Sequence, residues 1–77
     1  NAQGEERYGI ILANINKDVI LDNFSSLVKQ VEAGGTLLLS GLLIDDEKDI
    51  LSQASKYPLI FNGKSTRNNW ISLRFNR

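Results

Sequence analysis

Four positions in this chain combine a residue type and a location that could support chemistry. Asn14 stands near the end of a short apolar run, Ser40 and Gly41 end or kink a second run, and Trp70 opens a third. Open α/β sheets bind ligands at the carboxyl ends of their strands, and a carboxamide there offers one acceptor and two donors. Asn14 is therefore a candidate ligand-binding residue. The alternative is that Asn14 or Asn16 caps the helix that follows.

The other candidates each admit two interpretations. The Ser40 hydroxyl could contact a substrate, or it could have its hydrogen bonds satisfied within the sheet. Gly41 inside a strand indicates a bulge or a close backbone approach. Trp70 could line a pocket or pack in the core. Asp45 and Asp46 resemble a pair of catalytic carboxylates, but at the start of a predicted helix we interpret them as caps.

Composition excludes several kinds of site. The chain has 77 residues with no cysteine and no histidine. Zinc sites, disulfides and Cys/His catalytic dyads are therefore excluded, and a metal site could use only carboxylate oxygens. No apolar run approaches the ~18 residues of a membrane span, and no signal peptide opens the chain. We expect one domain of a cytoplasmic protein without a membrane partner.

The charges are unevenly distributed although they sum to zero. Residues 1–55 hold nine acids and four bases, a balance of −5, and residues 56–77 hold five bases and no acid, a balance of +5. One interpretation is a solvated helix start followed by an ordinary basic edge. The other is a contact surface for an acidic partner. We expect no direct contact with nucleic acid.

Hydrophobic spacing predicts the elements that hold these residues. Residues 8–15 form an apolar run without alternation, which is typical of a strand covered on both faces. Residues 16–32 form one predicted helix, because apolar side chains recur every three or four positions, and Gly34 and Gly35 are expected to end it. Residues 1–7 carry no periodicity and are interpreted as a disordered terminus or an expression scar.

The second half of the chain continues this alternation of elements. Residues 36–43 are a predicted strand, and the helix after Asp46 is expected to stop at Tyr57 and Pro58. A short strand over residues 59–62, a polar turn over 64–69 and an alternating strand over 70–75 complete the chain. The predicted order is β-α-β-α-β-β, an α/β fold with two parallel crossovers and a terminal antiparallel hairpin. Its second helix is expected to pack inward through Ile50, Leu51 and Ala54.

The first predicted strand indicates that this chain is half of a larger domain. A strand that is apolar throughout is an aggregation hazard when it lies at a sheet edge. We therefore infer the second half of a doubly wound domain. We also expect the isolated chain to self-associate through residues 8–15. No glycine-rich phosphate-binding turn follows this strand.

The chain resembles the C-terminal half of the PrmA-type ribosomal protein methyltransferases. The resemblance rests on Ala13-Asn14-Ile15, on Ala33-Gly34-Gly35, on Leu39-Ser40-Gly41-Leu42-Leu43 and on Trp70, and it extends from Tyr8 to Arg77. Ala33 stands where the family usually has proline. The cofactor glycine loop, the acidic ribose-binding residue and the substrate-recognition domain of the family would lie outside this chain.

The resemblance implies a fold, a reaction and a set of site residues. The fold is the C-terminal half of a Rossmann-like methyltransferase sheet. The reaction is methyl transfer from S-adenosylmethionine to lysine or N-terminal amines of a ribosomal protein, the stalk-base protein L eleven. Asn14 would be catalytic by aligning the amine, Ala13 would contact the cofactor, and Ile15, Ser40, Gly41 and Trp70 would bind substrate. The isolated chain is expected to be inactive and not to bind S-adenosylmethionine. The alternative is a free-standing, non-catalytic α/β module that binds a protein partner.

Overall fold

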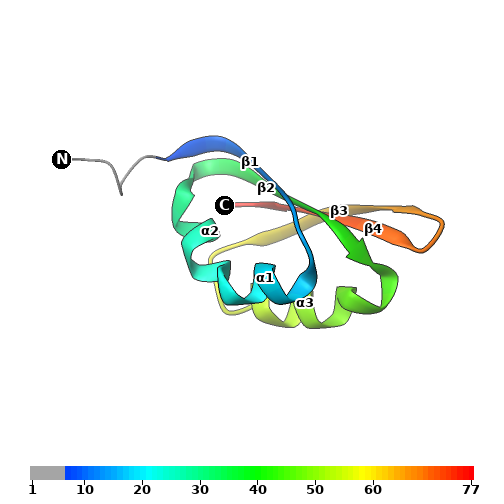
Figure 1. Ribbon diagram of the computed structural model, residues 1–77. Helices are drawn as coiled ribbons and strands as arrows, with labels where there is room; N and C mark the ends of the chain where they lie inside the picture. Colours follow the sequence, from blue (N-terminus) through cyan, green and yellow to red (C-terminus); the bar gives the residue numbers. More distant parts are fainter. Residues whose placement is uncertain (1–6) are drawn as a thin grey trace.

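A computed structural model describes residues 7–77, and apart from Arg7 the expectation for residues 1–7 lies outside this range. The described chain is a four-stranded sheet with three α-helices on one face (Figure 1). The elements in chain order are β1 (Tyr8–Asn14), α1 (Lys17–Asp22), α2 (Phe24–Gln30), β2 (Val31–Leu43), the 3₁₀ helix η2 (Ile44–Asp46), α3 (Glu47–Ala54), β3 (Ile60–Arg67) and β4 (Trp70–Asn76).

The sheet has the strand order β1-β2-β4-β3. β1 pairs parallel to β2, and β4 pairs antiparallel to both β2 and β3. β3 therefore runs in the same direction as β2, with β4 inserted between them. This arrangement confirms the α/β fold, the two crossovers and the terminal hairpin. β1 and β3 are the two edge strands.

The hydrophobic core lies between the sheet and its helices. The alternation in β4 is confirmed, because Ile71, Leu73 and Phe75 point into the core. The predicted inner face of α3 is confirmed too, with Ile50 and Ala54 buried and Leu51 packed against them. The buried residues from both layers are Ala13, Ile20, Phe24, Val28, Val31, Leu37, Leu39, Leu42, Ile50, Ala54, Ile71, Leu73 and Phe75.

The single helix predicted over residues 16–32 is wrong, because two helices occupy this segment. The first ends at Asp22 and is capped by Asn23, whose side-chain Nδ2 donates to the Val19 carbonyl at 2.8 Å and whose backbone N–H closes the same turn. The second ends at Gln30, and Val31 is already extended. The apolar stripe continues across the break, with Ile20 and Phe24 both buried, so the stripe gives no sign of it.

The prediction that Gly34 and Gly35 cap a helix is also wrong, because both lie within β2, which begins at Val31. Gly34 does adopt a left-handed φ of 83°, and its N–H donates to the Arg77 carbonyl at 2.9 Å. Gly35 is buried, and a Cβ built there would lie 2.9 Å from the Gly9 carbonyl oxygen. The glycine pair thus lets β2 pass close to β1 where their register shifts.

The helix after β2 starts and stops differently from the prediction. It ends at Ala54, before Tyr57 and Pro58, and residues 55–58 form turns. Asp46 does act as a cap, but for η2: its Oδ2 accepts from the Leu43 N–H at 2.9 Å. No capping hydrogen bond from a side chain is recorded at the start of α3.

The third strand is longer than predicted, and the predicted polar turn is correspondingly shorter. β3 extends to Arg67, which pairs with Trp70, so the turn contains only Asn68 and Asn69. Asn68 has a positive φ of 56°, which asparagine tolerates better than most residues. Polar residues 64–67 are held in the strand by backbone pairing to β4, since their side chains are exposed.

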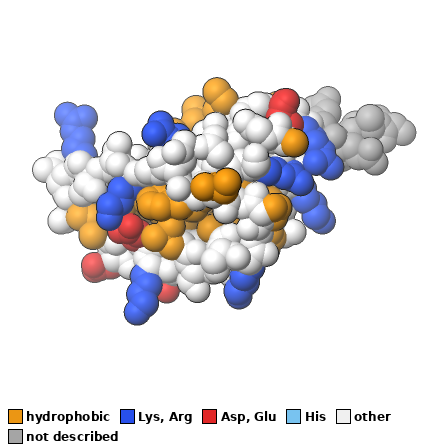
Figure 2. Space-filling model, turned by 180° about the vertical axis from the view of Figure 1, so that it is seen from behind, with side chains coloured by type: hydrophobic (Ala, Val, Ile, Leu, Met, Phe, Trp, Pro, Cys, Tyr) orange, Lys and Arg blue, Asp and Glu red, His pale blue; other side chains and the backbone are white. Residues whose placement is uncertain are grey.

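The prediction that the first strand is covered on both faces is wrong for the described chain. The Ile10 and Leu12 side chains are 67% and 70% exposed, while Ala13 is buried. The cause is that the helices cover one face and β1 has a neighbour on one side. Hydrophobic side chains are also visible at the surface in Figure 2, between scattered lysine and arginine side chains. Across residues 7–77, no helix is long and apolar enough to cross a membrane.

Candidate functional site

Asn14 ends β1 at the edge of the sheet where the parallel strands β1 and β2 terminate. It pairs in register with Ser40 of β2, and its side chain is exposed. Within residues 7–77, no hydrogen bond to the Asn14 carboxamide is recorded. Asn16 instead caps α1, because its Oδ1 accepts from the Val19 N–H at 3.0 Å. Capping is thus the work of Asn16, which leaves the Asn14 carboxamide available to a ligand.

Gly41 forms a bulge beside Asn14. The pairing of β2 with β4 shifts between Leu39 and Leu42, and Gly41 has a left-handed φ of 79°. A Cβ built on Gly41 would overlap the Oδ1 atom of Asn14 and lie 3.4 Å from the Ile15 backbone nitrogen and oxygen. The predicted bulge is therefore present, and it brings β2 against the segment that carries Asn14 and Ile15.

A shallow depression of about 230 Å³ next to this bulge collects most of the predicted substrate residues. Ser40, Gly41 and Trp70 all line it, and Ile15 adjoins Gly41. Trp70 is 55% exposed, so the interpretation of Trp70 as a core residue is excluded. Residues 65, 67, 71 and 72 complete the lining.

The sequence-based reasoning missed Ser65 and Arg67 as neighbours of this site. Both belong to the segment predicted as a turn, and only the pairing of β3 with β4 brings them beside Trp70 and Ser72. The alternation in β4 does place Ser72 on the same side as Trp70, which was a usable signal. No comparable pattern marks Ser65 or Arg67.

Ala13 contributes differently from the other predicted site residues. Its side chain is only 7% exposed and belongs to the core under the helices. The methyl group of Ala13 thus faces away from Asn14, since successive side chains of a strand point to opposite faces. Any contact of Ala13 with a cofactor would have to come from its backbone.

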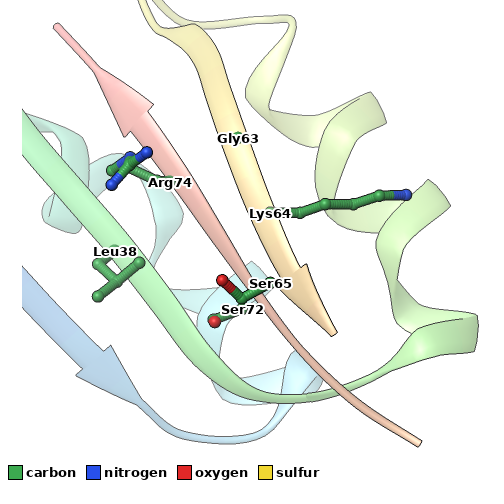
Figure 3. Close-up of a pocket in the computed structure, with 6 residues that line it drawn as sticks. All are labelled: Leu38, Gly63, Lys64, Ser65, Ser72 and Arg74. Carbon is green, nitrogen blue, oxygen red and sulfur yellow. The ribbon is translucent and has the colours of Figure 1, made fainter. Parts of the chain in front are cut away.

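A second, smaller depression of about 60 Å³ lies on the uncovered face, between β2, β4 and β3. Figure 3 shows Ser65 and Ser72 side by side there, with Arg74 and Leu38 further along the strands. Lys64 points the opposite way, toward α3, where its Nζ lies 3.1 Å from Glu47 Oε2. The polar groups at this depression are thus two hydroxyls and one guanidinium.

An ion pair connects the start of α1 to the start of α3. Lys17 Nζ lies 3.0 Å from Asp49 Oδ2 and 3.9 Å from Asp46 Oδ1. The hydrogen bond that Lys17 Nζ donates to Asp49, together with the negative charges of Asp49, Asp46 and Asp18, raises the pKa of Lys17 above its ordinary value. Asp46 thus caps η2 and Asp49 pairs with Lys17. No group of three potential metal ligands occurs among residues 7–77.

Comparison with known proteins identifies the family. The family model described as ribosomal protein L11 methyltransferase (PrmA) matches residues 1–77. Among curated relatives, the ribosomal protein L11 methyltransferase of Porphyromonas gingivalis is 38% identical over 68 residues, covering 88% of this chain and 23% of the relative. That of Bacteroides fragilis strain ATCC 25285 is 32% identical over 73 residues, covering 95% of this chain and 26% of the relative.

A solved structure agrees in fold. The ribosomal protein L11 methylase of Lactobacillus delbrueckii subsp. bulgaricus superposes with a TM-score of 0.87 at 22% identity, over 95% of this chain and 38% of that chain. This chain belongs to the ribosomal protein L11 methyltransferase (PrmA) family. It spans about a quarter of the length of the curated relatives it matches. None of these similarities supports the alternative of a free-standing interaction module.

Proposed function

We propose that this chain is the C-terminal part of a longer, cytoplasmic, S-adenosylmethionine-dependent methyltransferase. The enzyme methylates amines, lysine side chains or an N-terminal amine, of a ribosomal protein. Family membership supports the reaction class, and the names of the relatives support the substrate. The short coverage of those relatives supports the interpretation that this chain supplies one part of the active site.

The observation that carries the proposal is the Asn14 carboxamide at the carboxyl end of β1. It is exposed, and Asn16 performs the capping that would otherwise explain it. Its Oδ1 can accept a hydrogen bond from the N–H of a neutral amine, which holds the nitrogen in place and directs its lone pair. Methyl transfer to an amine needs little more than an uncharged nucleophile and alignment.

The residues present fit the reacting end of S-adenosylmethionine. This cofactor supplies a methyl group on a positively charged sulfur. The exposed Asn14 carboxamide lies against the Gly41 backbone, and Gly41 also lines the shallow depression, so the methyl group could approach Asn14 from that open surface. No glycine-rich turn follows β1 in this sequence, so the nucleoside end would be bound by another part of the enzyme.

The remaining site residues have supporting roles in this proposal. Trp70 and Ser40 line the depression into which the substrate segment would enter, and the Ile15 backbone borders it at Gly41. Ala13 would reach the cofactor through its backbone, because its side chain is buried. Arg67 stands on the rim, where its charge would meet the substrate protein.

The test compares this chain with the full-length protein that contains it. The full-length protein is incubated with S-adenosylmethionine labelled in its methyl group and with purified ribosomal protein L11, and label on the ribosomal protein is counted. We expect the full-length protein to transfer label to the ribosomal protein and the 77-residue chain to transfer none. Calorimetric titration of the 77-residue chain with S-adenosylmethionine should show no binding. Absence of label transfer by folded full-length protein would refute the proposed reaction, and micromolar binding by the chain alone would refute the division of the site.

A further inference from the structure

The backbone of Gly41 in β2 lies directly against the side chain of Asn14 in β1. Gly41 sits in the bulge of β2 with a φ of 79°. The nearest atom to a Cβ built on it is Oδ1 of Asn14, at a separation shorter than real Cβ atoms show. The next nearest are the Ile15 nitrogen and oxygen, each at 3.4 Å. The missing side chain of Gly41 is thus the space that the Asn14 carboxamide occupies.

We propose that Gly41 is a positioning residue for Asn14, and that its backbone sets the direction in which the carboxamide points. The proposal rests on the proposed function of Asn14. An asparagine side chain has two rotatable bonds, and no hydrogen bond is recorded for this carboxamide within residues 7–77. Its orientation is therefore limited by packing, and the Gly41 backbone is the packing surface next to Oδ1.

The overlap defines what a methyl group at position 41 would displace. The overlapped atom is the far end of an exposed, flexible side chain, whereas the backbone atoms of Ile15 lie at a tolerable 3.4 Å. The conflict is therefore relieved by rotation of Asn14 and not by separation of β1 from β2. A Gly41→Ala protein should keep the fold and lose the orientation of the amide.

Gly34 provides a matched control within the same strand. Its φ of 83° is close to that of Gly41, and a Cβ built on it would have nothing within 4 Å. Alanine at either position must adopt the left-handed conformation, so both variants carry a similar backbone penalty. The variant at position 41 alone places a methyl group against Asn14.

The expected effect of Gly41→Ala on kcat follows from the sensitivity of the reaction rate to the alignment of the reacting groups. A misplacement of about 1 Å in a reacting group can lower a rate about 100-fold. We expect Gly41→Ala to lower kcat of the full-length enzyme about 100-fold, with little change in KM for S-adenosylmethionine. Gly34→Ala should retain a kcat close to that of the parent, because it moves no group of the site.

The experiment is a double-mutant cycle in the full-length enzyme. Gly41→Ala and Gly34→Ala are each made alone and with Asn14→Ala, and kcat and KM are measured for all variants. Gly41→Ala should lower kcat only where Asn14 is present. An equal loss in both backgrounds, or an equal loss from Gly34→Ala, would overturn the proposal. Should Gly41→Ala not fold, Gly41→Asn and Gly34→Asn repeat the comparison, because asparagine tolerates left-handed φ but still carries a Cβ.

A second readout separates this proposal from the proposed function. The side-chain amide signals of Asn14 are followed by ¹⁵N nuclear magnetic resonance, assigned by their loss in Asn14→Ala. They should shift in Gly41→Ala and stay in place in Gly34→Ala. Signals that do not move in Gly41→Ala would overturn the positioning role. Unchanged kcat in Asn14→Ala would instead overturn the proposed role of Asn14 in methyl transfer, whatever the amide signals do.

Discussion

Arg77 ties the last strand to the end of a helix, and replacing it should destabilise the chain measurably. Its Nη1 donates to the Val28 carbonyl at 2.9 Å and to the Val31 carbonyl at 2.6 Å. Val28 lies in the last turn of α2, where its carbonyl also accepts from the Val31 N–H and where a positive charge is favourable. A hydrogen bond from a charged donor contributes about 1.5–3 kcal/mol. Because one half-buried guanidinium nitrogen serves both carbonyls, we expect Arg77→Met to cost about 2 kcal/mol.

Urea unfolding followed by the fluorescence of Trp70, the single tryptophan, measures this loss. For a chain of this size the urea slope is about 1 kcal/mol/M, so the midpoint should fall by about 2 M. All variants are compared at one protein concentration, because association would raise apparent stability. Arg67→Met is the control, since Arg67 is exposed at the hairpin end, and it should change stability by less than about 0.5 kcal/mol. Equal midpoints for Arg77→Met and Arg67→Met would refute the reasoning.

Three further predictions concern the glycine pair, the ion pair and the sheet edge. Gly35→Ala should lower the urea midpoint more than Gly34→Ala, because its Cβ would lie 2.9 Å from two backbone oxygens and from Val31 Cγ1; equal midpoints would contradict the close approach. The raised pKa of Lys17 implies stability that is fully present below about pH 10 and lost as pH rises through the folded-state pKa. Lys17→Met should therefore flatten the alkaline loss of stability in pH-dependent melting, and an unchanged profile would argue against the pair. The isolated chain should self-associate through β1, and Leu12→Lys, at a 70% exposed position, should shift sedimentation toward monomer; a parent chain that stays monomeric up to millimolar concentration would show that this edge does not pair.

The hydrophobic periodicity of the sequence predicted the core well, because burial follows spacing directly. Ile20, Phe24 and Val28 are spaced four residues apart, and all three are buried. Phe24 also stacks on Tyr57, with ring centroids 5.2 Å apart. The break at Asn23 was not predictable from the same spacing. It arises from a local hydrogen bond between the asparagine side chain and the preceding turn, which leaves the apolar stripe in phase.

The glycine pair and the hairpin show a second limit of sequence reasoning. Gly34-Gly35 is equally compatible with a helix end and with a close strand crossing. The choice depends on Gly9, which is distant in sequence. Residues 64–67 carry no apolar pattern, so the sequence did not predict that their backbone pairs with β4.

The candidate site was predictable where it follows from strand ends. Asn14 and Ser40 pair because the carboxyl ends of parallel strands meet at the same edge of a sheet. The bulge was predictable because Gly41 is a glycine inside a strand. Trp70 reaches this edge because β4 runs antiparallel to β2, so that the first residue of β4 pairs with Leu43 at the carboxyl end of β2. The contact between Gly41 and the Asn14 carboxamide depends on the local bulge geometry, which spacing alone does not contain.

The most direct test of the account is the turnover of the full-length enzyme with Asn14→Ala, measured beside Asn16→Ala. Asn16 is two residues away and caps α1, so its replacement should cost about 1 kcal/mol of stability and leave kcat unchanged. Loss of an aligning hydrogen bond at Asn14 should cost about 2–4 kcal/mol in the transition state, a fall in kcat of about 30- to 1,000-fold. Asn14→Ala should thus be folded and slow, with its affinity for S-adenosylmethionine retained. A folded Asn14→Ala enzyme that turns over as fast as its parent would contradict the central claim that this carboxamide aligns the reacting amine.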